Sequence, residues 1–327
     1  MADRGVILFN LGGPENLADV RPFLYNLFSD PEIIRIPNDL ARKTLAWLIS
    51  TLRQRKSRGL YRQIGGGSPL RRITAAQAGA LEKSLEAAGK PVRVVVGMRC
   101  WKPTIDDAME QIRRDGIRQL VALPLFPQYS VTTTGSCFNY FRRCLERAGL
   151  AASVAVEWVE SWHEDPLYIE SMADLVQGES EKFSGGRPRE LTVLYSAHSI
   201  PSRYVEEGDP YLEQTRRSAA LIDTQLGTDT RSMLAFQSKV GPVRWLEPAT
   251  SDVIVRLGRS GCGSLLVVPI SFVSDHIETL QEIDIAYREL AARAGIGEFR
   301  RVPSLNLYPK FIECLAALAQ RAFSRMA

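Results

Sequence analysis

Seven apolar runs rich in β-branched residues recur along the 327-residue chain, and they lack the alternation of half-exposed strands. Continuous runs of this kind are typical of parallel strands that are covered on both faces. Amphipathic segments that fit helices lie between them, for example at 104–115, 211–226 and 276–294. Strands that alternate with helices predict an α/β doubly wound fold. The seven runs lie at 5–10, 92–97, 120–126, 153–159, 191–197, 232–238 and 264–272.

An internal repeat divides the predicted fold into two halves. The stretch "GVILFNLGGP" resembles "LTVLYSAHSIP", and "CWKPTIDDAMEQIRRDGIRQLVALPLF" resembles "RWLEPATSDVIVRLGRSGCGSLLVVPISF". In the second pair a glycine precedes a proline by eight positions in both copies, Gly116 to Pro124 and Gly261 to Pro269. We therefore predict two similar Rossmann-like, doubly wound halves whose parallel sheets face a central cleft. Ligands of such folds bind beyond the carboxyl ends of the strands.

The predicted boundaries place one half at 1–160 and the other at 161–305, with a C-terminal helix at 306–327 that could pack back on the first half. The first half carries an insertion at 37–74, whose segment 42–62 holds seven basic residues and no acid. A basic amphipathic helix can lie on an anionic membrane. Two other interpretations stay open, a helix with a solvated basic face and a lip over a large anionic ligand.

The composition limits the classes of partner and compartment. A net charge of +4 is mild, and nucleic-acid binding would need a concentrated basic face, so no nucleic-acid partner is expected. The N-terminus lacks the features of a signal peptide, and no run approaches the ~20 apolar residues of a membrane span. Five scattered cysteines indicate reduced thiols. We expect a cytoplasmic protein, with any membrane contact made peripherally through the basic and apolar part of the insertion at 40–58.

Two stretches carry residues suited to proton transfer or metal binding. His198 ends the run 191–197, and His276, Glu278 and Glu282 follow the run 264–272. Glu278 and Glu282 are spaced i and i+4, which places them on one face of a helix. Alone, two glutamates more often form a solvated face. Because parallel strands open onto the same edge, His198 and Glu278 together favour a weak, open site for proton transfer or one divalent metal.

Other motifs do not support a different chemistry. "LGGPEN" does not match the dinucleotide fingerprint, and "IGGGSP" at 64–69 lacks the P-loop lysine. Ser199 is not in the nucleophile elbow of a hydrolase. His163 in "ESWHEDP" is interpreted as a loop or helix-start residue. A hydrolase on the same fold therefore remains only a distant alternative.

Several long motifs resemble the ferrochelatase family of class II chelatases, which insert ferrous iron into protoporphyrin IX to form protohaem. The resemblance covers nearly the whole chain and implies two Rossmann-like halves around a porphyrin cleft, in agreement with the repeat. It also implies Fe²⁺ and protoporphyrin IX as substrates, in the terminal step of haem biosynthesis. The motifs are "LFNLGGPENLADVRPFL", "YRQIGGGSPL", "GMRCWKP", "LFPQYSVTTTGS", "YSAHSIP", "GDPY", "QSKVGPVRWLEP" and "VPISFVSDHIETLQEID".

The resemblance assigns roles to individual residues. The essential histidine of the family corresponds to His198 and its partner carboxylate to Glu278, both as catalytic residues and as metal ligands, with His276 and Glu282 in support. The order in which His198 and Glu278 handle protons and metal stays open. The positions that match porphyrin-binding residues are Arg53, Tyr61, Ser68, Tyr129 and Trp245.

Three departures from the family pattern carry information. Cys314 stands alone in the C-terminal tail, whereas cluster-containing relatives group cysteines there, so we predict no iron–sulfur cluster and no tightly bound cofactor. Ala286 ends the line of acids that continues in some relatives. Leu11 stands where relatives that use coproporphyrin III carry a tyrosine, which favours protoporphyrin. A non-catalytic tetrapyrrole or haem carrier, or a chelatase for another divalent metal, remains the alternative.

Overall fold

The computed structural model describes residues 3–227, 231–239 and 241–326, and the chain divides into two compact units. Unit 1 comprises the chain up to Ser161 together with the segment from Phe311 onward, and unit 2 comprises Trp162–Lys310. Each unit contains one four-stranded sheet in which every neighbouring pair is parallel. The prediction of an α/β fold with two parallel sheets is confirmed.

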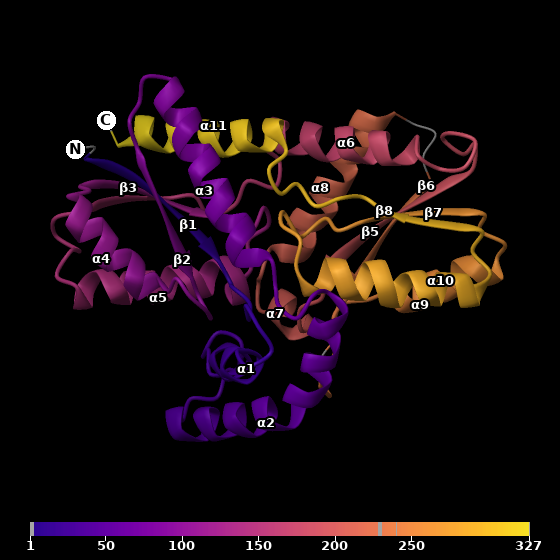
Figure 1. The fold of residues 1–327 in the computed structure, drawn as a ribbon, viewed down its shortest axis with the longest axis horizontal. Helices are drawn as coiled ribbons and strands as arrows, with labels where there is room; N and C mark the ends of the chain where they lie inside the picture. Colours follow the sequence, from indigo (N-terminus) through magenta and orange to yellow (C-terminus); the bar gives the residue numbers. More distant parts are fainter. Residues whose placement is uncertain (1–2, 228–230, 240, 327) are drawn as a thin grey trace. The chain divides into compact units, whose positions relative to one another are not determined.

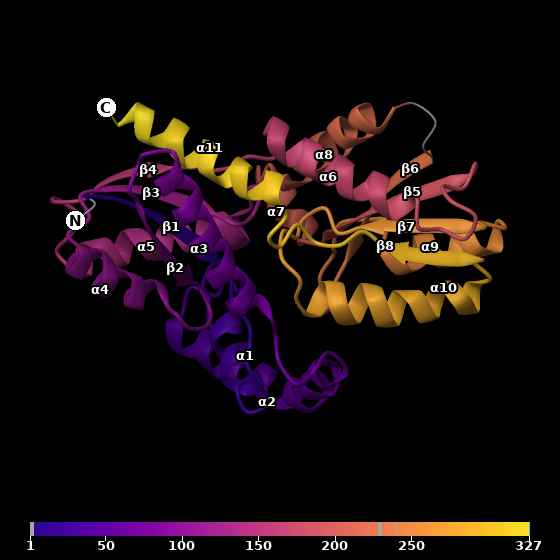
Figure 2. The same cartoon turned by 45° about the horizontal axis from the view of Figure 1, so that its top comes forward.

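The sheet of unit 1 has the strand order β2-β1-β3-β4. Figures 1 and 2 show α4 and α5 on one face and α3 and α11 on the other. Phe9 lies at the centre of the core under α5, where it contacts the rings of Phe138 and Phe141. The elements are β1 Arg4–Asn10, α3 Leu70–Ala87, β2 Arg93–Met98, α4 Ile105–Asp115, β3 Gln119–Pro124, η1 Val131–Gly135, α5 Ser136–Arg147, β4 Ala155–Trp158 and α11 Pro309–Arg325.

The sheet of unit 2 has the corresponding order β6-β5-β7-β8. Helices α6 and α8 cover one face, and η2, α9 and α10 cover the other, where Ile283 and Tyr287 join the core (Figure 2). The elements are α6 Pro166–Ser180, β5 Leu191–His198, α7 Ser202–Glu206, α8 Tyr211–Leu226, β6 Arg231–Gln237, α9 Thr250–Arg259, β7 Ser264–Val268, η2 Glu278–Tyr287, α10 Arg288–Ala294 and β8 Glu298–Arg301.

Two further helices, α1 (Val20–Phe28) and α2 (Asp39–Gln63), lie apart from the sheet of unit 1 (Figure 1). The side chain of Asn38 caps α2 by accepting from the Ala41 N–H. The segment after α1 is fixed to the sheet through Asp30, which accepts from Ser136 Oγ and pairs with Arg99 at 3.0 Å.

No helix among the described residues has the length and apolar character needed to cross a bilayer.

Three elements differ from their predicted form. The helix predicted at 276–294 is a π-helix from Glu278 to Tyr287 that continues as the α-helix α10. The strand predicted at 264–272 ends at Val268, because Pro269 cannot donate to the ladder. The sequence analysis missed β8, which has only four residues, three of them charged, and lies at the edge of its sheet.

Candidate active site

His198 is the last residue of β5, and a closed ring of hydrogen bonds holds its main chain. The hydroxyl of Tyr211 donates to the His198 carbonyl at 2.8 Å, so the Ser271 hydroxyl, 2.6 Å away, donates to Tyr211. The His198 N–H completes the ring by donating to Ser271 Oγ at 3.3 Å. No described residue makes a hydrogen bond to either ring nitrogen of His198. The backbone of His198 is therefore fixed, while the described residues leave both nitrogens of its imidazole without a hydrogen bond.

His276 and Glu278 form an ion pair beside the start of η2. The distance from His276 Nε2 to Glu278 Oε2 is 2.7 Å, and His276 Nδ1 lies 2.9 Å from the Ser274 carbonyl. Because both ring nitrogens face oxygen acceptors, both carry protons and the ring is an imidazolium. Burial lowers the pKa of His276, but Glu278 outweighs it and the pKa is raised. The arrangement therefore favours the charged form of both side chains.

The pKa of Glu278 shows how strongly this environment favours the carboxylate. Burial alone would raise the pKa, but the charge and hydrogen bond of His276, together with the charge of His198, lower it to about 2. Phe272 contacts both imidazoles, with ring centroids 6.0 Å from His198 and 4.4 Å from His276. Unit 2 thus gathers His198, His276 and Glu278 around one aromatic side chain.

Asp275 anchors the segment that carries this pair. It accepts hydrogen bonds from Arg301 at 3.0 Å, Ser304 at 3.0 Å and Asn306 at 2.8 Å. Burial raises the pKa of Asp275, but Arg301 and these donors lower it overall. The sequence analysis missed these supporting residues. The acid next to His276 was visible, but its partners lie 26 to 31 positions further along the chain, and no spacing rule links them.

Glu282, one turn beyond Glu278, lies in a different environment. Its Oε1 accepts from the Ser238 N–H at 3.0 Å and from the Tyr287 hydroxyl at 2.8 Å. Its Oε2 accepts from Gln237 Nε2 at 3.2 Å and from the Ser238 hydroxyl. The structure therefore brings Glu282 to the strand end of β6 and engages both of its oxygens with donors of the protein.

Trp245 lies in the segment after β6, where a β-bridge pairs it with Pro201, three residues after His198. Its indole Nε1 is buried, and no described residue accepts a hydrogen bond from it. The main chain on either side is also paired, because the Ser202 N–H donates to Arg244 and the Leu246 N–H donates to Ile200. Trp245 is thus fixed beside the residues that follow His198.

The remaining candidates belong to unit 1. Leu11 follows β1, and Ser68 packs against the same turn, since a Cβ at Gly13 would meet the Ser68 side chain at 2.8 Å. Tyr61 is buried near the end of α2, and half-buried Arg53 lies over the ring of Phe28 at 5.7 Å. Burial lowers the pKa of Arg53. The structure brings Ser68 against Gly13 and Pro14, in the turn that follows Leu11.

Tyr129 precedes the π-helix η1. Its hydroxyl lies over that helix, where a Cβ added at Gly135 would meet it at 2.9 Å. The side chain of the next residue, Ser130, caps η1 by accepting from the Thr132 N–H. Tyr129 is therefore set by the start of η1, at the carboxyl end of β3.

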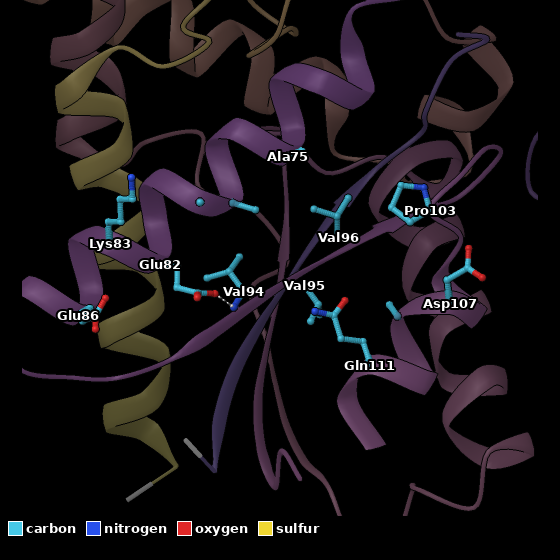
Figure 3. A pocket seen from close by; sticks show the side chains of 13 residues that line it. Ala75, Glu82, Lys83, Glu86, Val94, Val95, Val96, Pro103, Asp107 and Gln111 are labelled. Atoms are coloured by element: carbon cyan, nitrogen blue, oxygen red, sulfur yellow. Dashed lines mark hydrogen bonds between the residues drawn. The ribbon is translucent and has the colours of Figure 1, made fainter. Parts of the chain in front are cut away.

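A cavity of about 520 Å³ lies elsewhere in unit 1, between α3, β2 and α4 (Figure 3). Its lining includes Ala75, Val94 and Asp107, and Glu82 accepts from the Val94 N–H at 2.8 Å at its edge. None of the predicted site residues lines it. The chemistry-bearing groups of unit 2, and not this cavity, define the candidate active site.

The described residues contain no group of three or more histidines, cysteines or acids placed to hold a metal ion. Four of the five cysteines are buried as free thiols, and Cys262 is partly exposed. A site of one imidazole and one carboxylate has few protein ligands, which suits a metal that has to leave.

Comparison with known proteins shows which protein family the chain resembles. The ferrochelatase family model matches residues 3–323. A ferrochelatase of Synechococcus sp. (strain JA-3-3Ab) is 53% identical over 98% of this chain and 94% of its own length. A ferrochelatase of Gloeothece citriformis is 52% identical over 96% of this chain and 81% of its own length. Among solved structures, SirB from Bacillus subtilis with Fe³⁺ has a TM-score of 0.56, with 15% identity over 76% of this chain and 88% of that one. At that identity, the likeness shows the fold alone.

Proposed function

The chain belongs to the ferrochelatase family, the lyases that insert ferrous iron into protoporphyrin IX, and we propose that His198 and Glu278 divide the chemistry of this reaction between them. The reaction replaces two pyrrole N–H protons of the neutral porphyrin by one Fe²⁺. One group must therefore take up protons, and another must meet the cation while its water ligands leave.

The pKa of Glu278 supports the assignment of the two roles. A carboxyl group with a pKa of about 2 is a poor proton acceptor at neutral pH, but it stays available as a hard oxygen ligand for a divalent cation. No residue that the structure describes makes a hydrogen bond to the ring of His198, and an imidazole is the side chain best matched to proton transfer near pH 7. We assign proton acceptance to His198 and the metal contact to Glu278.

His276 keeps Glu278 ready for this role. As an imidazolium it neutralises the carboxylate before iron arrives, and its hydrogen bond to the Ser274 carbonyl fixes the ring. When a cation reaches Glu278, the positive charge of His276 opposes it and favours loss of the metal toward the porphyrin. His276 therefore tunes the carboxylate and is not itself a ligand in this scheme.

The porphyrin ring and its propionates need separate contacts. We assign Trp245, Tyr129 and Leu11 to the apolar ring, because aromatic and aliphatic side chains bury a flat hydrophobic surface well. Arg53, Tyr61 and Ser68 are assigned to the propionates, for which charged and hydroxyl donors are suited. A bent ring would expose its nitrogen lone pairs, so binding that favours the bent form would lower the barrier to metal insertion.

An anaerobic assay tests the proposed function. The protein is mixed with protoporphyrin IX and Fe²⁺, and the absorption spectrum is followed for conversion of the free base to the metalloporphyrin. The wild-type chain should convert it catalytically, and His198→Ala should bind porphyrin with unchanged affinity but fail to convert it. Binding without turnover by the wild-type chain would instead support a haem or tetrapyrrole carrier. Turnover with Co²⁺ or Ni²⁺ but not with Fe²⁺ would support a different chelatase.

A second proposal concerns a membrane partner. Helix α2 exposes large apolar side chains, with Leu40 76% and Leu52 72% accessible, next to basic residues such as Lys43 and Lys56. We propose that α2 rests on anionic lipid. Co-sedimentation with phosphatidylserine vesicles should fall for Leu40→Asp/Leu52→Asp and with rising salt. Equal sedimentation of the variant and the wild type would contradict this.

A further inference from the structure

The hydrogen bonds of Glu282 differ from those expected of a carboxylate that passes on protons or metal ions. Its spacing from Glu278 suggests a second acid along a path for protons or metal. However, four donors from three residues occupy its two oxygens, namely the Ser238 N–H and hydroxyl, Gln237 Nε2 and the Tyr287 hydroxyl. A carboxylate offers about four lone-pair positions, so this set fills it. Binding iron or a proton there would require breaking these bonds.

Ser238 shows what the bonds accomplish. Its φ is +66°, and it is one of two non-glycine residues with positive φ among the described residues. This left-handed conformation is unfavourable for a residue with a Cβ, and it persists only where surrounding contacts impose it. Both the N–H and the hydroxyl of Ser238 are bound to Glu282. The carboxylate is thus the contact that holds Ser238 in its strained form.

The turn at Ser238 directs the segment that leaves β6 toward Trp245. The far end of that segment is already tied down, because the Phe236 N–H donates to Pro248 and the Leu246 N–H donates to Ile200. Its near end is held at Ser238, where the main-chain N–H and the hydroxyl both donate to Glu282. Through Gln237, whose side chain also accepts from Ser196 on β5, the same carboxylate is linked to the strand that ends at His198.

We propose that Glu282 is a positioning residue that holds the turn at Ser238, and so places the Trp245 segment beside His198, without itself carrying protons or iron. The proposal rests on the proposed function, since the segment matters through the porphyrin that Trp245 is assigned to contact. It gives a structural basis to the supporting role that the family resemblance implied for Glu282.

Glycine at position 238 gives a direct test, because glycine adopts positive φ without help. Glu282→Ala should lower kcat/KM for porphyrin about tenfold or more, and Glu282→Ala/Ser238→Gly should recover to within about threefold of the wild type. Glu282→Ala/Ser238→Ala is the matched control. Alanine and glycine both remove the hydroxyl and differ only in the Cβ, so the alanine double variant should show no recovery. Thermal unfolding of each variant checks that the fold is intact.

A second measurement separates positioning from relay. Glu282→Gln keeps a carbonyl acceptor but cannot titrate, so under the proposal it should retain more activity than Glu282→Ala and leave the pH profile of kcat unchanged. Equal losses in both variants, a shifted pH profile, or equal recovery by glycine and alanine would overturn the proposal. The wild-type assay and His198→Ala are run alongside. If the wild type converts porphyrin, the proposed function stands whatever Glu282 does, and if it does not, the proposed function fails first.

Discussion

The two units place different residues at equivalent positions of the same backbone. Leu8 pairs with Leu123, one residue before Pro124, and Tyr195 pairs with Val268, one residue before Pro269. Counting three residues on from Leu8 and from Tyr195, Leu11 in unit 1 corresponds to His198 in unit 2. One strand end carries an apolar side chain and the other the proposed proton acceptor. The sheet topology is repeated, and the imidazole at this strand end is present in one copy only.

The π-helices extend this comparison. In each unit, the third strand in sequence order is followed by a π-helix. Helix η1 follows β3 in unit 1, and η2 follows β7 in unit 2. Such helices are rare and occur often at functional sites. The Ser130 hydroxyl caps the start of η1, whereas His276 and Glu278 lie at the start of η2. The start of the π-helix therefore carries neutral groups in unit 1 and charged groups in unit 2.

The largest effect should come from replacing His198 of unit 2 by leucine, the residue at the equivalent position of unit 1. His198→Leu removes the proposed proton acceptor, and loss of a general base typically costs 10²–10⁴-fold in rate, so we expect a fall in kcat of about that size. His163→Leu is the matched control, because His163 lies in the same unit outside the site and should leave kcat nearly unchanged. Initial rates of anaerobic metalloporphyrin formation measure both. Similar rates for His198→Leu and the wild type would remove the distinction between the two strand ends.

The second-largest effect should come from removing the negative charge of Glu278 at the start of η2. Glu278→Gln keeps the shape of the side chain but removes the anionic ligand, so the KM for Fe²⁺ should rise and kcat should fall, together by roughly 10²-fold. Porphyrin affinity, followed by fluorescence quenching, should stay within a few-fold of the wild type. If the metal dependence were unchanged while porphyrin binding was lost, Glu278 would belong with the ring contacts.

The ion pair also makes the stability of unit 2 depend on pH. The pKa of Glu278 falls from its ordinary 4.5 to about 2, so its contribution is present above pH 4.5 and is lost as pH falls toward 2. The pKa of His276 is raised above 6.5, so its contribution is present below pH 6.5 and is lost as pH rises through the raised value.

The difference in unfolding free energy between the wild type and His276→Gln should therefore be largest between about pH 4.5 and 6.5. A charged hydrogen bond of this kind contributes roughly 1.5–3 kcal/mol. Urea unfolding of the metal-free proteins across pH 4–9 measures it. A difference that is flat across this range would show that the pair is not charged as described.

The sequence predicted the strands, their parallel pairing and the place of His198 and Glu278 well, because buried strands and strand-end residues leave local patterns. The roles of Glu282 and Asp275 were less accessible, because their partners lie far away in the chain. Ser238, 44 positions from Glu282, gives no local signal of its positive φ, and the spacing of Glu282 from Glu278 indicated only that both lie on one face of a helix. The periodicity of a sequence indicates which face of a helix a residue occupies. Whether all hydrogen-bonding positions of its side chain are filled depends on tertiary contacts.

The smallest predicted effect returns to the other strand end. Leu11 lies two residues before Gly13, against which Ser68 packs, and under the proposed function a larger, polar side chain at position 11 would meet porphyrin substituents over that turn. Leu11→Tyr should lower the preference for protoporphyrin over coproporphyrin III, and because one side chain in an apolar pocket discriminates only modestly, the change in the ratio of kcat/KM values should be roughly tenfold. Leu11→Met, which keeps the apolar character and similar volume, is the control and should leave the ratio unchanged. If methionine shifted the ratio as far as tyrosine, packing of the turn, and not its polarity, would set the preference at this end of the sheet.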